Sequence, residues 1–306
     1  MPEGNEIHRW ALRHTAAFAG KKIRVEAPAA SRFKDASALD NRKLVTVRAV
    51  GKHLGYDFGK DRILHVHLGM YGDFTEGTGV LPPEKGALRI RMYDAKAIKL
   101  PPAPGESKRH TWYSNDDGTG HIAPVQVAWV ELRGPTDCSV FTEGQWKDLE
   151  ARLGPDPLNG DAATQFIEKV SKRKTPIAAL LMDQAVAAGI GNIYRAELLF
   201  RHKLDPFTPG NEVPVKLLQA IWKDAIPLMK AGMVDRRIVT TRPKDRPTKK
   251  TGTPLKEEAH YVYRKQGRPC LICETKIKTE VMAGRNLFWC PFCQRPASEQ
   301  SEVAAS

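Results

Sequence analysis

Several features are missing from this sequence, and each absence narrows the class of protein. No run of about 18 apolar residues occurs along the 306 residues, so a transmembrane helix is not expected. The first ten residues contain two acids and no apolar segment, which is not the pattern of a secretory signal. No internal repeat occurs along the chain. We therefore expect a cytoplasmic globular protein.

Cysteine is also scarce, and a disulfide framework is not expected in a chain without a leader. Four of the five cysteines nevertheless fall within 24 positions, as two C-x2-C pairs separated by sixteen residues. Two such turns bring four thiolates to one tetrahedral ion and leave no open position for catalysis, so one structural Zn²⁺ is predicted. The expected ligands are Cys270, Cys273, Cys290 and Cys293. The fifth, Cys138, is interpreted as a small buried hydrophobe.

Acidic residues are too few to balance the basic ones, and the net charge is +13. Between Arg236 and Arg295 there are 15 Lys/Arg and five Asp/Glu, an excess of ten. A basic chain can simply be soluble, but charge concentrated in one module favours a phosphate-bearing partner. A zinc ribbon can also bind protein; the basic segment KIKTEVMAGRNLFW between the cysteine pairs favours DNA.

The order of patterns along the chain predicts an α+β fold. Residues 3–19 have the period of one helix, with Ile7, Ala11 and Phe18 on one face. Short runs rich in Val, Ile, Tyr and Phe follow, and they predict an antiparallel β-sandwich or barrel. Residues 100–117 are expected to form a loop over that sheet. The predicted organisation is a β-sandwich domain at 1–141, a helical domain at 142–242, a mobile basic loop at 243–259, a zinc finger at 260–296 and a tail at 297–306.

The first residues carry a possible reaction centre. Pro and Glu are common in the first turn of a helix, because Pro lacks the unpaired N–H and Glu complements the dipole. However, removal of Met1 would leave Pro2 with a free secondary amine, a nucleophile able to attack C1′ of a deoxyribose. Glu3, one residue away, could supply the proton that opens the sugar ring.

Five ordered motifs resemble those of the formamidopyrimidine-DNA glycosylase/endonuclease VIII family. The N-terminal segment is similar to the family's PEGPEI start, and a long segment is close to its helix–two-turn–helix signature. The others look like its lysine hairpin, its strand-insertion loop and its zinc-finger hairpin. The matching segments are PEGNEI (2–7), AVGKHL (49–54), HLGMYG (67–72), LLMDQAVAAGIGNIYRAELLF (180–200), and VYRKQGRPC (262–270) with GRNLFWCPFCQR (284–295).

The resemblance implies a bifunctional DNA glycosylase/AP lyase of base excision repair, which removes a damaged base and cleaves the strand by β,δ-elimination. It implies that Pro2 is the Schiff-base nucleophile and Glu3 the general acid and proton shuttle. Lys52 would hold a phosphate and support proton transfer, although a solvated hairpin charge is the simpler interpretation. Glu6 matches a second acidic position of less defined role.

The resemblance also implies a DNA-binding surface. Met70 and Tyr71 would fill the space left by an everted nucleotide, although both could instead be core residues of a strand. Asn192, where the GIGN turn opens a helix, and Arg285 of the finger would hold phosphates. The N–H groups of that turn are expected to face a phosphate.

Departures from the family pattern bear on the substrate. The segment LRGPTDCSV lacks the paired arginines and phenylalanine of the formamidopyrimidine branch, which together with Gly4 favours the endonuclease VIII branch and oxidised pyrimidines. Two other functions compete: a catalytically silent paralogue that binds damaged DNA, and a zinc-ribbon factor. Pro2, Glu3 and Lys52 argue against the first, because a binder has no use for an amine–carboxylate pair. We expect a monomer acting on damaged DNA.

Overall fold

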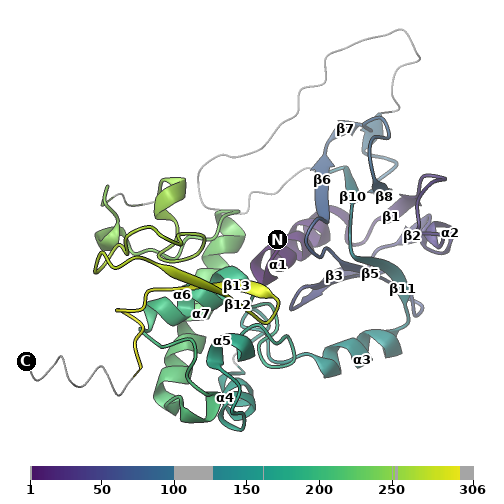
Figure 1. Cartoon of the computed structure of the whole chain (residues 1–306). Helices are drawn as coiled ribbons and strands as arrows, with labels where there is room; N and C mark the ends of the chain where they lie inside the picture. The colour runs from purple at the N-terminus through teal and green to yellow at the C-terminus, as the bar shows by residue number, and fades with distance from the viewer. Residues whose placement is uncertain (1, 100–126, 161, 250, 252–253, 297–306) are drawn as a thin grey trace, which may run out of the picture. The chain divides into compact units, whose positions relative to one another are not determined.

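The computed structural model describes residues 2–99, 127–160, 162–249, 251 and 254–296, which form two compact units (Figure 1). The first unit contains Pro2 and residues 6–151, and the second contains residues 3–5 and the chain from Arg152 onward. The expected loop at 100–117 and the expected tail at 297–306 fall outside the described residues. Within the described residues no helix is both long and apolar enough to cross a membrane.

The first unit is an antiparallel β-sandwich, as the alternating runs predict. Its sheets have the orders β2-β1-β8-β10-β6 and β11-β5-β4-β3, and β7 and β9 form a short parallel pair. Apolar side chains of both sheets share one core. The strands are β1 (Lys22–Glu26), β2 (Arg42–Lys43), β3 (Thr46–Val50), β4 (His53–Asp57), β5 (Ile63–His67), β6 (Asp73–Gly77), β7 (Gly79–Val80), β8 (Leu88–Tyr93), β9 (Ile98–Lys99), β10 (Trp129–Arg133) and β11 (Asp137–Phe141).

Three helices accompany these strands: α1 (Gly4–Phe18), α2 (Ala36–Leu39) and α3 (Glu143–Arg152). The predicted face of α1 is buried, with Ile7 and Phe18 at 1% exposure. The first unit extends to residue 151, because α3 packs on the sandwich. Trp146 of α3 is fully buried, and a Cβ on Gly55 of β4 would lie 2.7 Å from its ring.

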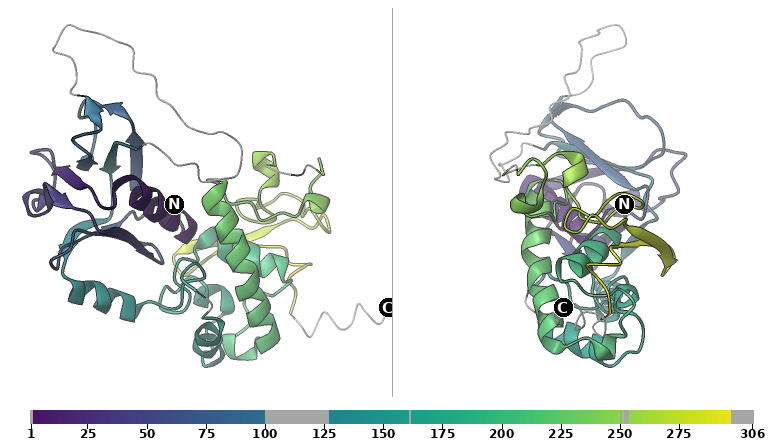
Figure 2. Two further views of the ribbon diagram at one scale, coloured as in Figure 1. Left: turned by 180° about the vertical axis from the view of Figure 1, so that it is seen from behind. Right: turned by 60° about the vertical axis from the view of Figure 1, so that its left-hand side comes forward.

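The second unit is helical and ends in a β-hairpin. The longest helix, α7, runs alongside α4 and α6, and the hairpin strand β13 packs on α6 (Figure 2). A two-residue turn at Ala283 and Gly284, both with positive φ, closes the hairpin. The elements are α4 (Ala163–Ser171), α5 (Ile177–Leu180), α6 (Asn192–Arg201), α7 (Val215–Val234), the 3-10 helices η1 (Gly210–Glu212), η2 (Pro243–Asp245) and η3 (Lys256–Glu258), β12 (Lys278–Met282) and β13 (Arg285–Trp289).

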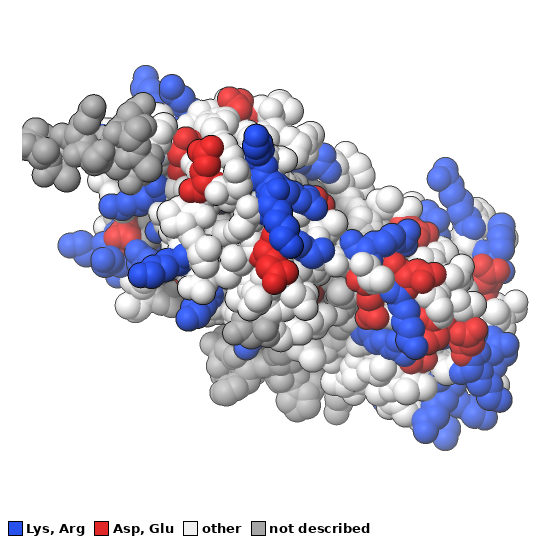
Figure 3. Space-filling view, turned by 90° about the horizontal axis from the view of Figure 1, so that it is seen from below, with Lys and Arg blue, Asp and Glu red and all other residues white. Residues whose placement is uncertain are grey.

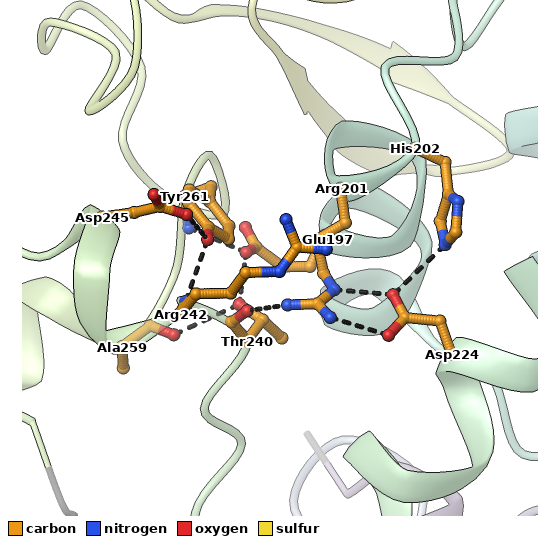
Figure 4. A network of polar contacts seen from close by, with 9 residues as sticks. All are labelled: Glu197, Arg201, His202, Asp224, Thr240, Arg242, Asp245, Ala259 and Tyr261. Carbon is orange, nitrogen blue, oxygen red and sulfur yellow. Dashed lines mark hydrogen bonds and ion pairs between the residues drawn. The ribbon is translucent and has the colours of Figure 1, made fainter. Parts of the chain in front are cut away.

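The segment that leads from α7 to the hairpin is fixed by a buried carboxylate. Glu197 of α6 is fully buried and accepts N–H donors from Tyr261 at 2.7 Å and from Val262 and Tyr263 at 2.8 Å each. The Thr240 hydroxyl donates to the same carboxylate. Figure 4 shows the contacts of Glu197 with Thr240 and Tyr261, together with the neighbouring contacts of Asp224 with Arg201 and His202.

Composition predicts a mobile loop at 243–259, but the described residues of this stretch make specific polar contacts. Arg246 is buried and donates to the hydroxyl and the carbonyl of Thr241. The Glu258 carboxylate accepts from both the N–H and the hydroxyl of Thr248, at 2.9 and 2.8 Å. Hydrogen bonds therefore hold parts of this stretch, and its mobility stays a prediction.

Candidate active site and zinc centre

Glu3 caps the first turn of α6. Its side chain is 1% exposed, Oε1 accepts the N–H of Ile193 at 2.7 Å, and Oε2 accepts the N–H groups of Gly191 and Tyr194 at 3.2 and 3.3 Å. The first N–H groups of a helix have no partner inside the helix, and the dipole there favours an anion. The helix therefore stabilises the negative charge of a carboxylate that lies 188 residues earlier in the chain than Gly191.

Glycines make this approach possible. The N–H of Gly4 donates to the carbonyl of Gly189 at 2.9 Å, and a Cβ on Gly4 would lie 2.8 Å from the Cα of Gly189. A Cβ on Gly191 would lie 2.6 Å from Cδ of Glu3. Residues 3 and 4 therefore pack directly on the GIGN turn. The sequence predicts that the N–H groups of this turn face a phosphate; this is corrected for residues 191, 193 and 194, whose N–H groups bind Glu3.

Pro2 is half-buried and directly precedes Glu3. Because the Glu3 carboxylate is held by hydrogen bonds, the nitrogen of Pro2 is restricted in where it can lie. Glu6, one turn into α1, forms a bidentate ion pair with Arg9, with Nε to Oε2 at 3.0 Å. The Arg9 guanidinium lies 4.0 Å from the ring centroid of Trp10. This pair holds the Glu6 side chain along its own helix, and a catalytic contribution of Glu6 stays a prediction.

Lys52 and the loop of residues 68–72 lie at one end of the four-stranded sheet. Lys52 is half-buried in the turn between β3 and β4, directly before His53. His53 pairs across the sheet with His67, which directly precedes the loop. The loop presents Met70 and Tyr71 outward, at 48% and 84% exposure, so neither is a core residue.

The same sheet end contains a histidine cluster that was not predicted from the sequence. Nδ1 of His53 lies 2.9 Å from Nε2 of His65, and Nδ1 of His65 lies 3.0 Å from the carboxylate of Asp137. Burial lowers the pKa of His65. Burial also lowers the pKa of His67, and the charge of Lys52 lowers it further. At neutral pH the rings of His65 and His67 are therefore uncharged.

Asn192 and Arg285 both belong to the second unit. Nδ2 of Asn192, the first residue of α6, donates to the carbonyl of Asn286 in β13 at 3.0 Å. Arg285 is the neighbouring residue and is exposed at the start of β13, after the hairpin turn. The structure thus brings together two residues that are 93 positions apart and for which the same role is predicted.

The four clustered cysteines fit a single metal ion. All four Sγ atoms lie within 4.8 Å of one another, and the closest pairs are 3.4 Å (Cys273–Cys290 and Cys273–Cys293) and 3.9 Å (Cys270–Cys293) apart. Sulfurs at about 2.3 Å from a tetrahedral Zn²⁺ would be roughly 3.8 Å apart. The geometry agrees with the predicted structural zinc site, and Cys138 stands apart, half-buried in β11.

Comparison with known proteins agrees with this arrangement. Residues 1–100 match the formamidopyrimidine-DNA glycosylase N-terminal domain, residues 153–243 its H2TH domain, and residues 267–296 the zinc finger found in FPG and IleRS. The chain is 40% identical over 300 residues to Endonuclease 8 1 of Mycobacterium tuberculosis, covering 96% of this chain and 100% of that one. The chain belongs to the formamidopyrimidine-DNA glycosylase/endonuclease VIII family. Its members are DNA glycosylases with AP lyase activity in base excision repair, and so is this protein.

Other relatives are less similar. The formamidopyrimidine-DNA glycosylase of Thermus thermophilus is 26% identical, covering 96% of this chain and 98% of that one. The crystal structure of the MutM (Fpg) protein from that organism has a TM-score of 0.68, 24% identity and coverage of 96% and 98%. A Lactococcus lactis FPG mutant in complex with Fapy-dG-containing DNA has a TM-score of 0.70, 21% identity and coverage of 96% and 100%. The higher identity to Endonuclease 8 1 agrees with the predicted branch.

The zinc centre yields a test. Cys290→Ser should remove a thiolate ligand from a closed site, so the variant should lose its zinc and its ability to bind DNA. Metal content by atomic emission and DNA binding by anisotropy measure the two effects, with Cys138→Ser as the matched control that keeps both. A metal-free preparation with full DNA binding would contradict a structural role for zinc.

Proposed function

We propose that the protein removes oxidised pyrimidines through a Schiff base on Pro2 and then cleaves the strand by β,δ-elimination. The observation that carries this proposal is the buried Glu3 carboxylate, capped by three N–H groups and directly joined to Pro2. Burying a carboxylate costs stability unless it is fully hydrogen-bonded, and here the chain supplies those bonds over a distance of 188 residues. These hydrogen bonds hold the Glu3 carboxylate, an acid–base group, beside Pro2.

The proposed chemistry uses Glu3 as a proton shuttle. The carboxylate first accepts a proton from the Pro2 ammonium group, which frees the lone pair of the nitrogen. That nitrogen attacks C1′ of the nucleotide, the bond from C1′ to the base breaks, and the base leaves with the remaining proton of the Pro2 nitrogen. The proton on Glu3 passes to the sugar ring oxygen as the bond from C1′ to that oxygen breaks, which leaves an iminium between Pro2 and C1′. Loss of a proton from the acidified C2′ then expels the 3′ phosphate, and loss of a proton from C4′ expels the 5′ phosphate.

The remaining residues would bind and distort the DNA. We propose that Lys52 holds a phosphate beside the abasic site and that Met70 and Tyr71 fill the space of the everted nucleotide. The exposure of both loop side chains supports this role. Asn192 and Arg285 would grip phosphates beside the lesion, and Glu6 would support catalysis.

The remaining proposals concern the oligomeric state, the location and the charge of the protein. We propose that the protein works as a monomer on damaged DNA in the cytoplasm, associated with the nucleoid. On the face shown in Figure 3, Lys and Arg side chains are interspersed with acidic and uncharged residues. The excess of ten positive charges between Arg236 and Arg295 supports a phosphate-binding role for the second unit.

The nucleophile can be tested by borohydride trapping on a duplex with an abasic site. A protein whose N-terminus is Pro2 should form a covalent adduct. The same protein extended by one residue before Pro2 should form none, because an amide nitrogen has no nucleophilic lone pair. Denaturing electrophoresis measures the adduct, and mass spectrometry confirms each N-terminus. An adduct from an extended protein whose terminal amine is also blocked by acetylation would identify a lysine, Lys52 first, as the nucleophile.

Glu3 should matter more for base removal than for strand cleavage. Opening the sugar of an intact nucleotide needs a proton on the ring oxygen, whereas an abasic site spends part of its time as the open aldehyde. Glu3→Gln should therefore lose roughly 10²- to 10⁴-fold in excision of an oxidised pyrimidine and keep measurable lyase activity. Pro2→Gly should impair both steps. The test compares the rates of both variants on a damaged-base duplex and on an abasic duplex of the same sequence. If Glu3→Gln slows base excision and strand cleavage equally, Glu3 is not an acid specific to base removal.

A further inference from the structure

Arg195 is a buried arginine in α6 that the mechanism above does not use. Its side chain is fully buried, Nη1 donates to the carbonyl of Met282 at 3.2 Å, and Nη2 donates to the carbonyl of Asn286 at 3.3 Å. Nη2 also donates to Oδ1 of Asn192, three residues earlier on the helix. One guanidinium thus connects the start of α6 to both strands of the zinc-finger hairpin.

This buried charge has no carboxylate partner within ion-pair distance among the described residues. All of its hydrogen bonds in the described chain go to neutral oxygens, and Nε is buried without a partner. Burial lowers the pKa of Arg195 to about 10, so the group stays charged at neutral pH. Burying a charge opposite neutral acceptors alone destabilises a fold, and local costs of this kind are typical of functional sites.

The position of the guanidinium determines what Asn192 can offer. An asparagine amide has one oxygen acceptor and two N–H donors. Here Oδ1 of Asn192 faces Arg195, and Nδ2 gives one hydrogen to the carbonyl of Asn286 at 3.0 Å. Within the described residues the second hydrogen of Nδ2 makes no hydrogen bond, and Asn192 as a whole is 6% exposed. With this orientation fixed, the amide can present a donor to an anion but cannot present its oxygen.

We propose that Arg195 is a positioning residue for DNA, which holds the Asn192 amide as a donor toward a backbone phosphate and never touches the phosphate itself. The proposal rests on the phosphate-binding role of Asn192 in the proposed function. A brace between α6 and the hairpin would explain the carbonyl contacts. Such a brace would not need the hydrogen bond from Arg195 to Oδ1 of Asn192. A neutral donor could also bind the two carbonyls, so a brace would not need a charged side chain.

The experiment is equilibrium binding to a duplex with a tetrahydrofuran abasic-site analogue, which needs no chemical step. Arg195→Met should weaken binding about tenfold or more, as loss of a hydrogen bond to a charged group would. Asn192→Ala should weaken it to a similar extent. The double variant should bind no more weakly than Asn192→Ala alone, because Arg195 acts through that side chain.

Arg201→Met is the matched control, because Arg201 lies on the same helix but pairs with Asp224, with Nε to Oδ2 at 2.6 Å. It should lower the Tm and leave the Kd unchanged. Additive losses from Arg195→Met and Asn192→Ala would overturn the proposal. So would a Kd for Arg195→Met equal to that of the wild type, which would make Arg195 only a brace.

A second variant keeps the proposal testable if Arg195→Met does not fold. Asn192→Asp keeps an oxygen acceptor for the Arg195 guanidinium but replaces the donor Nδ2 with a second oxygen, so it should weaken DNA binding more than Asn192→Ala does. Wild-type affinity of Asn192→Asp would contradict the proposal. If Asn192→Ala itself binds normally while borohydride trapping succeeds, this inference fails and the Pro2 chemistry stands.

Discussion

The hydrogen bonds between the Glu3 carboxylate and the first turn of α6 are the constraint on which the site depends. They satisfy three helix N–H groups and a buried charge at once. They also explain why three glycines are needed, since Gly4 and Gly189 meet backbone to backbone and Gly191 leaves room for the carboxylate. A short N-terminal segment is thereby held in place, and Pro2 with it. A free chain terminus is normally frayed, so a terminal nucleophile requires a device of this kind.

Buried charged side chains of helix α6 also hold other segments of the second unit by hydrogen bonds. Glu197 in its middle accepts three consecutive N–H groups from residues 261–263, where the chain enters the zinc finger. Arg195 ties the finger hairpin to the beginning of the helix. Three charged side chains in one small region therefore connect the N-terminal segment, the helical domain and the finger. Because each is buried and hydrogen-bonded to backbone groups of a distant segment, a one-residue change at any of them affects more than its own contact.

Much of the fold and part of the site could be predicted from the sequence. Strand alternation indicated the sandwich, the burial of Ile7 and Phe18 follows the helical period, and C-x2-C spacing located the metal site. Long-range polar contacts could not be predicted, because nothing local in PEG or GIGN indicates that one binds the other. The end of the first unit at residue 151 depends on the burial of Trp146, a tertiary effect that has no local signal in the sequence. The sequence contains only one weak indication of the role of Arg195, namely a charged residue among apolar residues of a predicted helix.

The most direct test of this account is the single-turnover rate of base excision by Gly191→Ala. Gly191 has φ −124° and ψ −159°, a conformation that alanine adopts freely, so the only expected effect is the Cβ that would lie 2.6 Å from Cδ of Glu3. Displacement of the carboxylate should slow excision roughly 10²-fold, with zinc content unchanged. Gly144→Ala, where the nearest atom would lie at 3.7 Å, should keep the wild-type rate. Excision by Gly191→Ala at the wild-type rate would contradict the central role of the Glu3 cap.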